Sequence, residues 1–557
     1  MVGRKSTGGW VLAMAVASPA AAEDLDALAR GVLAQHAQTI QPLEIEAARR
    51  FWDANESGTD VSYGLKNEAD RRLDTALADR DFFRRLKRCH EATLSDALVA
   101  RQIRLLYLQA LARQVDSDLL DELAVRANGL EMRFNAFRAR VGQEELPASK
   151  VRKILRESAD SDRRRAVWEA SRLLGAELAP ELLALVKLRN RSARQLGFSD
   201  YHAMLLDLNE QMPDDVLGRF DEVEALTREP FLAAKRDIDA RLAAQCHVAL
   251  DELRPWHYHD PFFREPPLPP SAGLDRVFAG LDVVELSRQF YAGIGLPVDE
   301  VLQRSDLYEK PRKHPSAFCL DIDRAGDVRV LANVVPNAQW ATTMLHELGH
   351  AVYGSQNMPD ELPYLLRCES HLLTTEGLAA MFERFATDAE WLTGMGVRLD
   401  NPTEFREATR RALAVRLLVF SRFSQVVFRF ERELYQDPDQ DLGRLWWELV
   451  EKYQGLRRPD GRNAPDYACQ LHIATAPAYF HNYLLGELFA CQLQQAIARE
   501  LFGGADPAAV CYVGRREVGD FLRRRVVAPG RRLSWNELCK FATGEELSAR
   551  AFAEFIE

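Results

Sequence analysis

The stretch MLHELGHAVY, residues 344–353, decides how the rest of the sequence is interpreted. It places His346 and His350 four positions apart, with Glu347 directly after the first histidine. If the stretch is helical, both histidines lie on one face, one turn apart, and can offer ring nitrogens to a single metal ion. Glu347 can then stand beside the metal and take a proton from its bound water. The alternative is a chance pattern on an ordinary helix.

The residues before this motif predict a β-hairpin that leads into a helix. Two β-rich runs, Ala317–Ile322 and Val328–Val335, flank an RAGD turn, which is typical of a hairpin. Pro336 and Asn337 then supply a helix start, and AQWATTMLHELGHAVYGSQ continues with a helical period. The motif is therefore expected on a helix that follows a strand.

A catalytic zinc site needs a third protein ligand and one open position. The next helical stretch offers Glu376, 26 positions after the second histidine, and Thr374 and Thr375 are available to cap the start of its helix. Glu361 and Glu369 lie in or near the intervening loop. Glu376 is the preferred third ligand, and Glu369 is the second choice.

Length and charge narrow the classes of function. A chain of 557 residues exceeds the size at which one compact core keeps growing, so two lobes are expected. The sequence has 72 basic and 83 acidic residues and a net charge of -11, and its basic residues do not gather beside aromatic ones. This argues against a nucleic-acid partner. Beyond the N-terminus, no stretch approaches the roughly 20 apolar residues of a membrane span.

The N-terminus MVGRKSTGGWVLAMAVASPAAAED has the order of features found in secretory signals. A basic start precedes an apolar run over residues 10–17 and a small-residue site at residues 20–22. This predicts a signal peptide over residues 1–22 and therefore a periplasmic or secreted protein. The alternative is an amphipathic first helix of a cytoplasmic protein.

The remaining chain is mostly helical in its periodicity. From about Leu25 to Gln245, apolar residues recur at helical spacing with few helix breakers, so the predicted fold class is mainly α. The proline-rich segment REPPLPPSAG, residues 264–273, can be neither helix nor central strand and is interpreted as a loop within one unit. Residues 23–557 are expected to form a single two-lobed catalytic domain.

Residues 346–377, HELGHAVYGSQNMPDELPYLLRCESHLLTTEG, resemble the angiotensin-converting-enzyme (peptidyl-dipeptidase A) family of metallopeptidases. In that family H-E-x-G-H precedes an L-P-x-x-L-R stretch and a helix that carries the zinc glutamate. HPSAF (314–318), LWWELVEKYQGLRRP (445–459) and LHIATAPAYFHNYL (471–484) are similar to further segments of the family. The stretch YLLGELFA also resembles the thimet-oligopeptidase group.

This resemblance implies a mostly helical, two-lobed zinc peptidase with a deep central cleft and a small β-hairpin beside the active-site helix. It implies one Zn²⁺ per chain, held by His346, His350 and Glu376. By the same resemblance, Glu347 takes a proton from the zinc-bound water, which then attacks a peptide carbonyl polarised by the ion.

The tetrahedral oxyanion of such a reaction needs hydrogen-bond donors. The resemblance implies that these are His472 and Tyr483. Strict family spacing from His472 falls on Asn482, so the assignment assumes one inserted residue before Tyr483. Ala380 stands where the family has an acidic residue four positions after the zinc glutamate, so the sequence leaves open what orients the histidine ligands.

The resemblance also implies a set of substrate-binding residues. Tyr479 contacts the substrate carboxylate, His314 contacts the substrate backbone, and Ser316 and Ala317 lie on an edge strand that pairs with the extended peptide. Gln470 replaces the family's lysine, which grips the C-terminal carboxylate. A neutral amide anchors a carboxylate less strongly than an ammonium does, so the sequence predicts a reduced preference for free C-termini.

The predicted function is hydrolysis of short peptides, as an oligopeptidase or a peptidyl-dipeptidase. A catalytically silent peptide-binding relative with the same fold is the alternative. The intact His346, Glu347, His350 and Glu376 favour an enzyme, because a silent relative has no need to retain the base.

Overall fold

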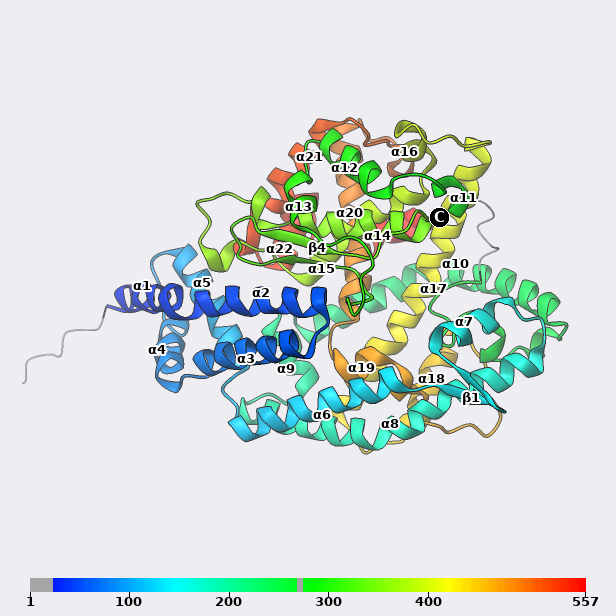
Figure 1. Ribbon diagram of the computed structural model, residues 1–557, viewed down its shortest axis with the longest axis horizontal. Helices are drawn as coiled ribbons and strands as arrows, with labels where there is room; N and C mark the ends of the chain where they lie inside the picture. Colours follow the sequence, from blue (N-terminus) through cyan, green and yellow to red (C-terminus); the bar gives the residue numbers. More distant parts are fainter. Residues whose placement is uncertain (1–23, 268–273) are drawn as a thin grey trace, which may run out of the picture.

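The computed structural model describes residues 24–267 and 274–557, and the expected signal peptide lies outside them. Helices dominate this part of the chain, and its strands form two short antiparallel hairpins. The predicted mainly α class is confirmed. Two large hydrophobic cores, one in each lobe, account for most of the buried apolar side chains, and the lobes stand one above the other in Figure 1.

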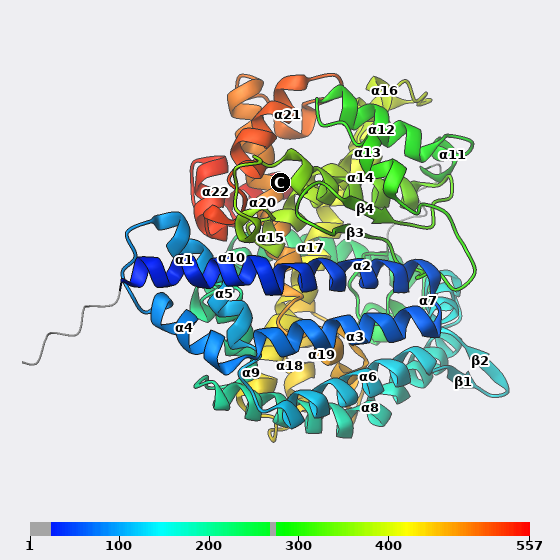
Figure 2. The same ribbon diagram turned by 60° about the vertical axis from the view of Figure 1, so that its left-hand side comes forward.

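The N-terminal helices pack around a smaller core of their own. They are α1 (Leu25–Gln35), which continues through a π-helical turn (His36–Ile40) into α2 (Gln41–Ser57), followed by α3 (Asp60–Leu77), α4 (Arg80–His90) and α5 (Ala97–Leu111). Figure 2 shows α1 and α2 running across the front of the molecule between the two lobes.

The lower lobe is built mainly from long helices. Its elements are α6 (Ser117–Ala136), β1 (Ala139–Val141), β2 (Glu144–Leu146), α7 (Ala148–Glu157), α8 (Ser161–Gln195), α9 (Tyr201–Leu208), α10 (Pro213–Cys246), α17 (Pro402–Gln436), α18 (Leu442–Gln454) and α19 (Leu471–Thr475). Helices α10 and α17 contribute side chains to both large cores, so they tie the lobes together. The β1–β2 hairpin was not predicted, because it interrupts an otherwise helical pattern at Gly142, which has a φ of 61°.

The upper lobe carries the predicted metal motif. Its elements are α11 (Leu274–Phe278), α12 (Val283–Gly293), α13 (Asp299–Arg304), β3 (Phe318–Asp321), β4 (Val328–Leu331), α14 (Ala338–Val352), α15 (Leu372–Glu383), α16 (Ala389–Gly394), α20 (His481–Leu501), α21 (Arg516–Leu522), α22 (Trp535–Thr543) and α23 (Arg550–Ile556). Helix α15 packs against α14 on one side and α20 on the other, so three helices form the centre of this lobe.

The predicted hairpin is present but shorter than expected. Strands β3 and β4 pair antiparallel, with Phe318 opposite Leu331 and Asp321 opposite Val328. The second run does not continue to Val335, because the N–H groups of the next residues bond to the carbonyl oxygens of Asp306 and Leu307 instead of to β3. The hairpin is therefore anchored to the segment that follows α13.

Two adjoining cavities meet at the metal motif, and the second of them lies between the lobes, as the expected cleft does. One, of about 520 Å³, is lined by β3, α14, α15 and two tyrosines near α20. The other, of about 480 Å³, is lined by α15 and α17 on one side and by the loop at residues 264–266 and α19 on the other. Among the described residues, no helix is both long and apolar enough to cross a bilayer.

Candidate metal centre

Helix α14 begins where the sequence predicts and holds the motif at the edge of the upper core. The side chain of Asn337 accepts the N–H of Trp340 at 2.9 Å and so caps the helix. Leu345, Leu348 and Val352 are fully buried in the core. The histidines lie on the opposite side of the helix and face the cavity between the lobes.

Glycines allow α15 to approach its two neighbours closely. A Cβ atom at Gly349 of α14 would lie 2.8 Å from the Cα of Ala379 on α15. On the other side, a Cβ at Gly377 would lie 2.7 Å from the carbonyl oxygen of Gly486 on α20. Any larger residue at either position would push the helices apart. The glycines thus let α15 lie close enough to α14 for Glu376, next to Gly377, to reach the histidines.

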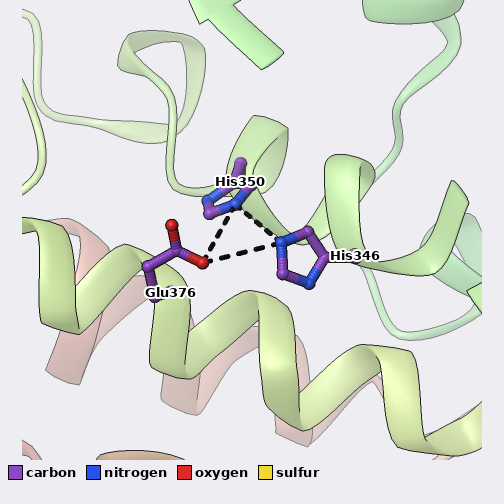
Figure 3. A group of neighbouring side chains, drawn as sticks. All are labelled: His346, His350 and Glu376. Atoms are coloured by element: carbon purple, nitrogen blue, oxygen red, sulfur yellow. Dashed lines mark hydrogen bonds and ion pairs between the residues drawn. The ribbon is translucent and has the colours of Figure 1, made fainter. Parts of the chain in front are cut away.

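The three predicted ligands form one group (Figure 3). The Nε2 atoms of His346 and His350 are 3.1 Å apart, and both lie near Oε2 of Glu376, at 3.6 and 3.9 Å. Ligand atoms about 2.1 Å from a tetrahedral zinc ion are separated by roughly 3.4 Å. The donor set and its spacing therefore fit a zinc ion. Glu369 lines the same cavity but does not belong to this group.

Each histidine is held by a hydrogen bond at its other ring nitrogen. Nδ1 of His346 donates to Oε2 of Glu383 at 2.8 Å, and Nδ1 of His350 and Oγ1 of Thr375 share a hydrogen bond at 2.7 Å. Glu383 also accepts from Nη2 of Arg416 at 3.1 Å. With Nδ1 protonated in each ring, Nε2 carries the lone pair that a metal requires.

The prediction that the threonines cap the start of α15 is confirmed for Thr374, which takes part in a capping box, and is wrong for Thr375. His371 occupies the cap position, where its Nδ1 accepts the N–H of Leu373, and Thr374 accepts the N–H of His371 in return. Both threonines lie within the first turn, beyond the cap. This leaves Thr375 available to His350.

The site has a strongly negative field. Burial lowers the pKa of His346, but the hydrogen bond to Glu383 and the charges of nearby carboxylates outweigh it and raise that pKa to about 9. Glu383 is partly buried, yet His346 and Arg416 lower its pKa and keep it ionised. A field that favours the imidazolium at this point also favours a metal cation.

Glu347 lies in the same cavity as the three ligands. It is 8% exposed and lies beside the hairpin, because the backbone of Cys319 on β3 is close enough to lower its pKa. Burial raises the pKa of Glu347 to about 7, with added contributions from Glu376 and Glu383. A carboxyl group with this affinity for protons can act as a base near neutral pH.

The two tyrosines predicted from the resemblance both reach the centre, in different ways. The hydroxyl of Tyr479 donates to Oε1 of Glu376 at 3.3 Å. This hydroxyl therefore binds a predicted metal ligand, whereas the resemblance implied a contact with the substrate carboxylate. Tyr483 lines both cavities, with its ring 5.4 Å from that of Tyr479. Asn482 is instead buried and accepts a hydrogen bond from Gln211.

His472 and Gln470 approach from the lower lobe. His472 lines the second cavity together with Tyr483 and Glu376, and Gln470 is buried beside it, with Nε2 3.2 Å from Nδ1 of His472. Burial and the charge of Arg264 lower the pKa of His472 to about 4, so the ring is neutral at pH 7. When the amide donates to Nδ1, the ring proton is on Nε2.

The segment before the hairpin differs from the prediction. Ser316 and Ala317 precede β3 and do not lie on it, because Pro315 has no N–H for a strand ladder and Nδ1 of His314 accepts the N–H of Ser316 in a tight turn. Ala317 lines the cavity of the metal centre. His314 and Ser316 do not line either cavity, and His314 is tied through its N–H to Asn55 on α2.

Sequence reasoning missed the residues that orient the histidines. Glu383 lies seven positions after Glu376, which is two turns along the same face of α15, so helical spacing offered a signal. Thr375 was considered only as a cap. Arg416 comes from α17, and nothing in the local sequence links it to the motif.

Comparison with known proteins extends the resemblance over most of the chain. The family model described as angiotensin-converting enzyme matches residues 24–229 and 274–557. Angiotensin-converting enzyme-like protein Ace3 of Mus musculus is 21% identical over 443 residues, which is 73% of this chain and 59% of the relative. Angiotensin-converting enzyme of Mesocricetus auratus is 20% identical over 422 residues, which is 70% of this chain and 32% of the relative.

A further relative, angiotensin-converting enzyme of Mus musculus, is 24% identical over 285 residues, or 49% of this chain and 21% of the relative. The chain therefore spans between about a fifth and three fifths of the length of these curated relatives. None of these matches is to a thimet oligopeptidase, so that likeness stays a prediction from the sequence. Because the family model matches most of its residues, the chain belongs to the angiotensin-converting enzyme family, whose peptidases depend on zinc.

Proposed function

We propose that this chain hydrolyses short peptides, as a zinc-dependent oligopeptidase or peptidyl-dipeptidase. One observation carries the proposal: Glu347 lies in the same cavity as the converging donor atoms of His346, His350 and Glu376. A metal site that only stabilises a fold has all its positions filled by protein ligands and needs no further buried carboxylate beside it. Three ligands and an adjacent base are what hydrolysis requires.

When bound, a zinc ion supplies Lewis acidity, which polarises a peptide carbonyl and lowers the pKa of water. Glu347 is the residue placed to take the proton of the attacking water and to deliver it to the leaving amine. Glu383 and Thr375 hold the two histidines in the tautomer that leaves Nε2 free for the metal.

Two residues, one from each lobe, supply donors for the oxygen that gains negative charge: His472 next to Gln470 in the lower lobe and Tyr483 on α20. His472 is neutral at pH 7, and its Nε2–H is available because Nδ1 faces the Gln470 amide. The hydroxyl of Tyr483 lines the same cavity. Removing one such donor in comparable enzymes costs about 10²–10³ in kcat. Tyr483 already lines the cavity of the metal centre, and His472 faces it from the other lobe.

The test combines metal analysis with a peptide digest. Purified protein should contain zinc at one per chain and cleave a mixture of short peptides, as detected by mass spectrometry. Chelation should abolish the cleavage, and added zinc should restore it. Zinc bound at one per chain with no cleavage of any peptide would favour the catalytically silent relative. A protein that binds no zinc contradicts both assignments.

A further inference from the structure

The segment that joins α19 to α20, residues 476–480, leads from His472 to the two tyrosines of the metal centre. It passes from the lower lobe to the upper lobe (Figure 1), and Tyr483 lies in the first turn of α20. Ala478, in the middle of the segment, has a φ of 52°, in the left-handed region that a residue with a Cβ atom rarely adopts. Such a conformation is strained and persists only where the surroundings hold it. The residues that hold this segment therefore help to decide where Tyr483 lies.

Glu431, on α17, holds the segment at its strained residue. Oε1 of Glu431 accepts the N–H of Ala478 at 3.0 Å, and the Glu431 side chain is only 3% exposed. Burial raises the pKa of Glu431 to about 8, so at pH 7 the carboxyl is largely protonated and keeps one oxygen as an acceptor. Without this acceptor, the N–H of Ala478 would be buried without a partner, at a cost in free energy.

Arg189, on α8, holds the end of α19 that leads into the segment. Nη2 of Arg189 donates to the carbonyl oxygen of Ala474, and Nη1 donates to the hydroxyl of Tyr435, both at 3.0 Å. The carbonyl of Ala474 is among the last four of α19, which have no partner within the helix. Tyr435 lies one turn after Glu431 on α17, so α8 and α17 hold the start and the middle of the connection together.

Gln211, in the turn between α9 and α10, holds the first turn of α20. Its Nε2 donates to Oδ1 of Asn482 at 2.9 Å, and its Oε1 accepts from Nε2 of His481 at 2.8 Å. All three side chains are buried. Both ends of the amide are thus used on two successive residues, and Tyr483 is the next residue along the chain. This pair of bonds restricts rotation of α20 about its axis.

We propose that Glu431 and Gln211 are positioning residues that hold the hydroxyl of Tyr483 toward the metal centre. The proposal rests on the proposed peptidase function, in which Tyr483 is a donor to the oxygen that gains charge. Neither Glu431 nor Gln211 lines the cavities of the metal centre. They therefore act through the chain at residues 478–482 and do not touch the peptide. A misplacement of about 1 Å at a reacting group can cost about 100-fold in rate.

The first test measures zinc content, kcat and KM for a short peptide. Glu431→Leu removes the acceptor of the Ala478 N–H, and Gln211→Leu removes both bonds to α20. Each should lower kcat by about 10- to 100-fold, with KM changed by no more than a few fold and zinc still bound at one per chain. An unchanged kcat in both variants overturns the proposal.

A conservative variant tests the hydrogen bond itself. Glu431→Gln keeps an acceptor of the same shape and should retain kcat to within a few fold, because the wild-type carboxyl is largely neutral at pH 7. If Glu431→Gln loses as much activity as Glu431→Leu, the assignment to this hydrogen bond is wrong. If Glu431→Leu does not fold, Gln211→Leu provides the same test from the other side of the segment.

Gln425→Leu is the matched control for a loss of stability alone. Gln425 is also buried on α17, but its Nε2 donates to the carbonyl oxygen of Phe220 on α10, away from the segment. Its loss should lower the free energy of unfolding with little effect on kcat. A fall in kcat as large as that of Glu431→Leu would mean that any weakening of α17 has this effect, and would overturn the proposal.

A double-mutant cycle tests whether Glu431 acts through Tyr483. Tyr483→Phe removes the hydroxyl, so adding Glu431→Leu in that background should lower kcat by no more than a few fold. Two changes that act on the same group are not additive. A full further loss of 10- to 100-fold in the double variant would show that Glu431 acts on something else.

A measurement without turnover separates this proposal from the proposed activity. In protein labelled with 3-fluorotyrosine, comparison with Tyr483→Phe identifies the fluorine NMR signal of Tyr483. This signal should shift or broaden in Glu431→Leu and Gln211→Leu and stay in place in Gln425→Leu. If this pattern is found in a protein that cleaves no peptide, the positioning is confirmed and the peptidase function fails. A Tyr483 signal that neither variant moves overturns the proposal, even if both variants lose activity.

Discussion

The metal centre adjoins a pocket of the lower lobe, here called the arginine pocket because Arg152, Arg172 and Arg264 line it, but the two are built in opposite ways. The metal centre takes its ligands from two neighbouring helices of the upper lobe, α14 and α15, and is surrounded by carboxylates. The arginine pocket takes its cations from α7, α8 and a loop of the lower lobe, and no carboxylate of the described residues lines it. One side therefore attracts a cation, and the other attracts an anion.

This difference follows from what each region must stabilise. A positive ion at the metal centre needs negative and neutral ligands, whereas the arginine pocket gathers cations, of which Arg264 is paired with Asp260. Helices of the same lobe pack rigidly and fix ligand geometry. The pocket faces that centre across the cleft, so substrate binding can depend on how the lobes approach each other.

The largest expected effect is a loss of zinc from the metal centre. Glu376→Ala should reduce zinc affinity by more than about 100-fold, since loss of an orienting partner alone costs about 10- to 100-fold. Glu369→Ala is the matched control, because Glu369 lines the same cavity outside the ligand group and should keep its zinc. Zinc content after dialysis against a weak chelator measures both. Loss of zinc in Glu369→Ala alone would move the third ligand to that residue.

The second largest expected effect is a loss of catalysis without a loss of bound zinc. Glu347→Gln should retain zinc at one per chain while kcat falls by about 10²–10⁴-fold, because an amide cannot accept the proton of water. The readouts are zinc analysis and peptide cleavage on the same sample. Unchanged cleavage in this variant contradicts the role of Glu347 as the base.

Removing the partner that orients His346 should have a smaller effect on metal binding. Glu383→Ala should weaken zinc binding by about 10- to 100-fold, because His346 loses the acceptor that fixes its tautomer. Glu361→Ala, in the exposed loop between α14 and α15, is the control and should bind zinc normally. Competition with a zinc-binding dye measures the affinity. Normal affinity in Glu383→Ala would show that packing alone orients the ring.

The smallest expected effect is a change in the pKa of His472, which lies at the boundary of the two regions. Arg264→Gln should raise the pKa of His472 above its value of about 4, since burial and then the Arg264 charge are what lower it. The His472 ring signal in an NMR titration measures the shift, with Arg165→Gln as the control. A pKa that does not move would show that burial acts alone.

The same histidine gives a sign for the dependence of stability on pH. Its pKa is about 4 in the folded state and about 6.5 in the unfolded chain, so the unfolded state binds more protons between these values. The contribution of neutral His472 to stability is therefore fully present above about pH 6.5 and is lost as the pH falls toward 4. Arg264→Gln should narrow the pH range over which this stability is lost. The free energy of unfolding, measured with denaturant at a series of pH values, can detect the change.

Much of the metal centre could be predicted from the sequence because its determinants are local. His346, Glu347 and His350 are fixed relative to one another by the turn of a single helix, and the hairpin before them is marked by alternating β-branched residues and a turn. Glu376 follows on the next helix. Glu383 could also have been recognised, since helical spacing puts it on the face of α15 that carries Glu376.

The arginine pocket could not be predicted, because it exists only where distant segments pack together. Arg172 and Gln470 lie about 300 positions apart, and the cavity between them depends on how α8 and α19 settle in the lower core. Arg416 reaches Glu383 for the same reason, through the path of α17 between the lobes. The sequence by itself determined the helical class and the relative placement of His346, Glu347 and His350, since hydrogen bonds within a few residues set those. The tertiary structure alone decided which cations face the cleft and remain without a counter-charge, because the burial of an arginine and the distance to its nearest carboxylate depend on the packing of the whole core.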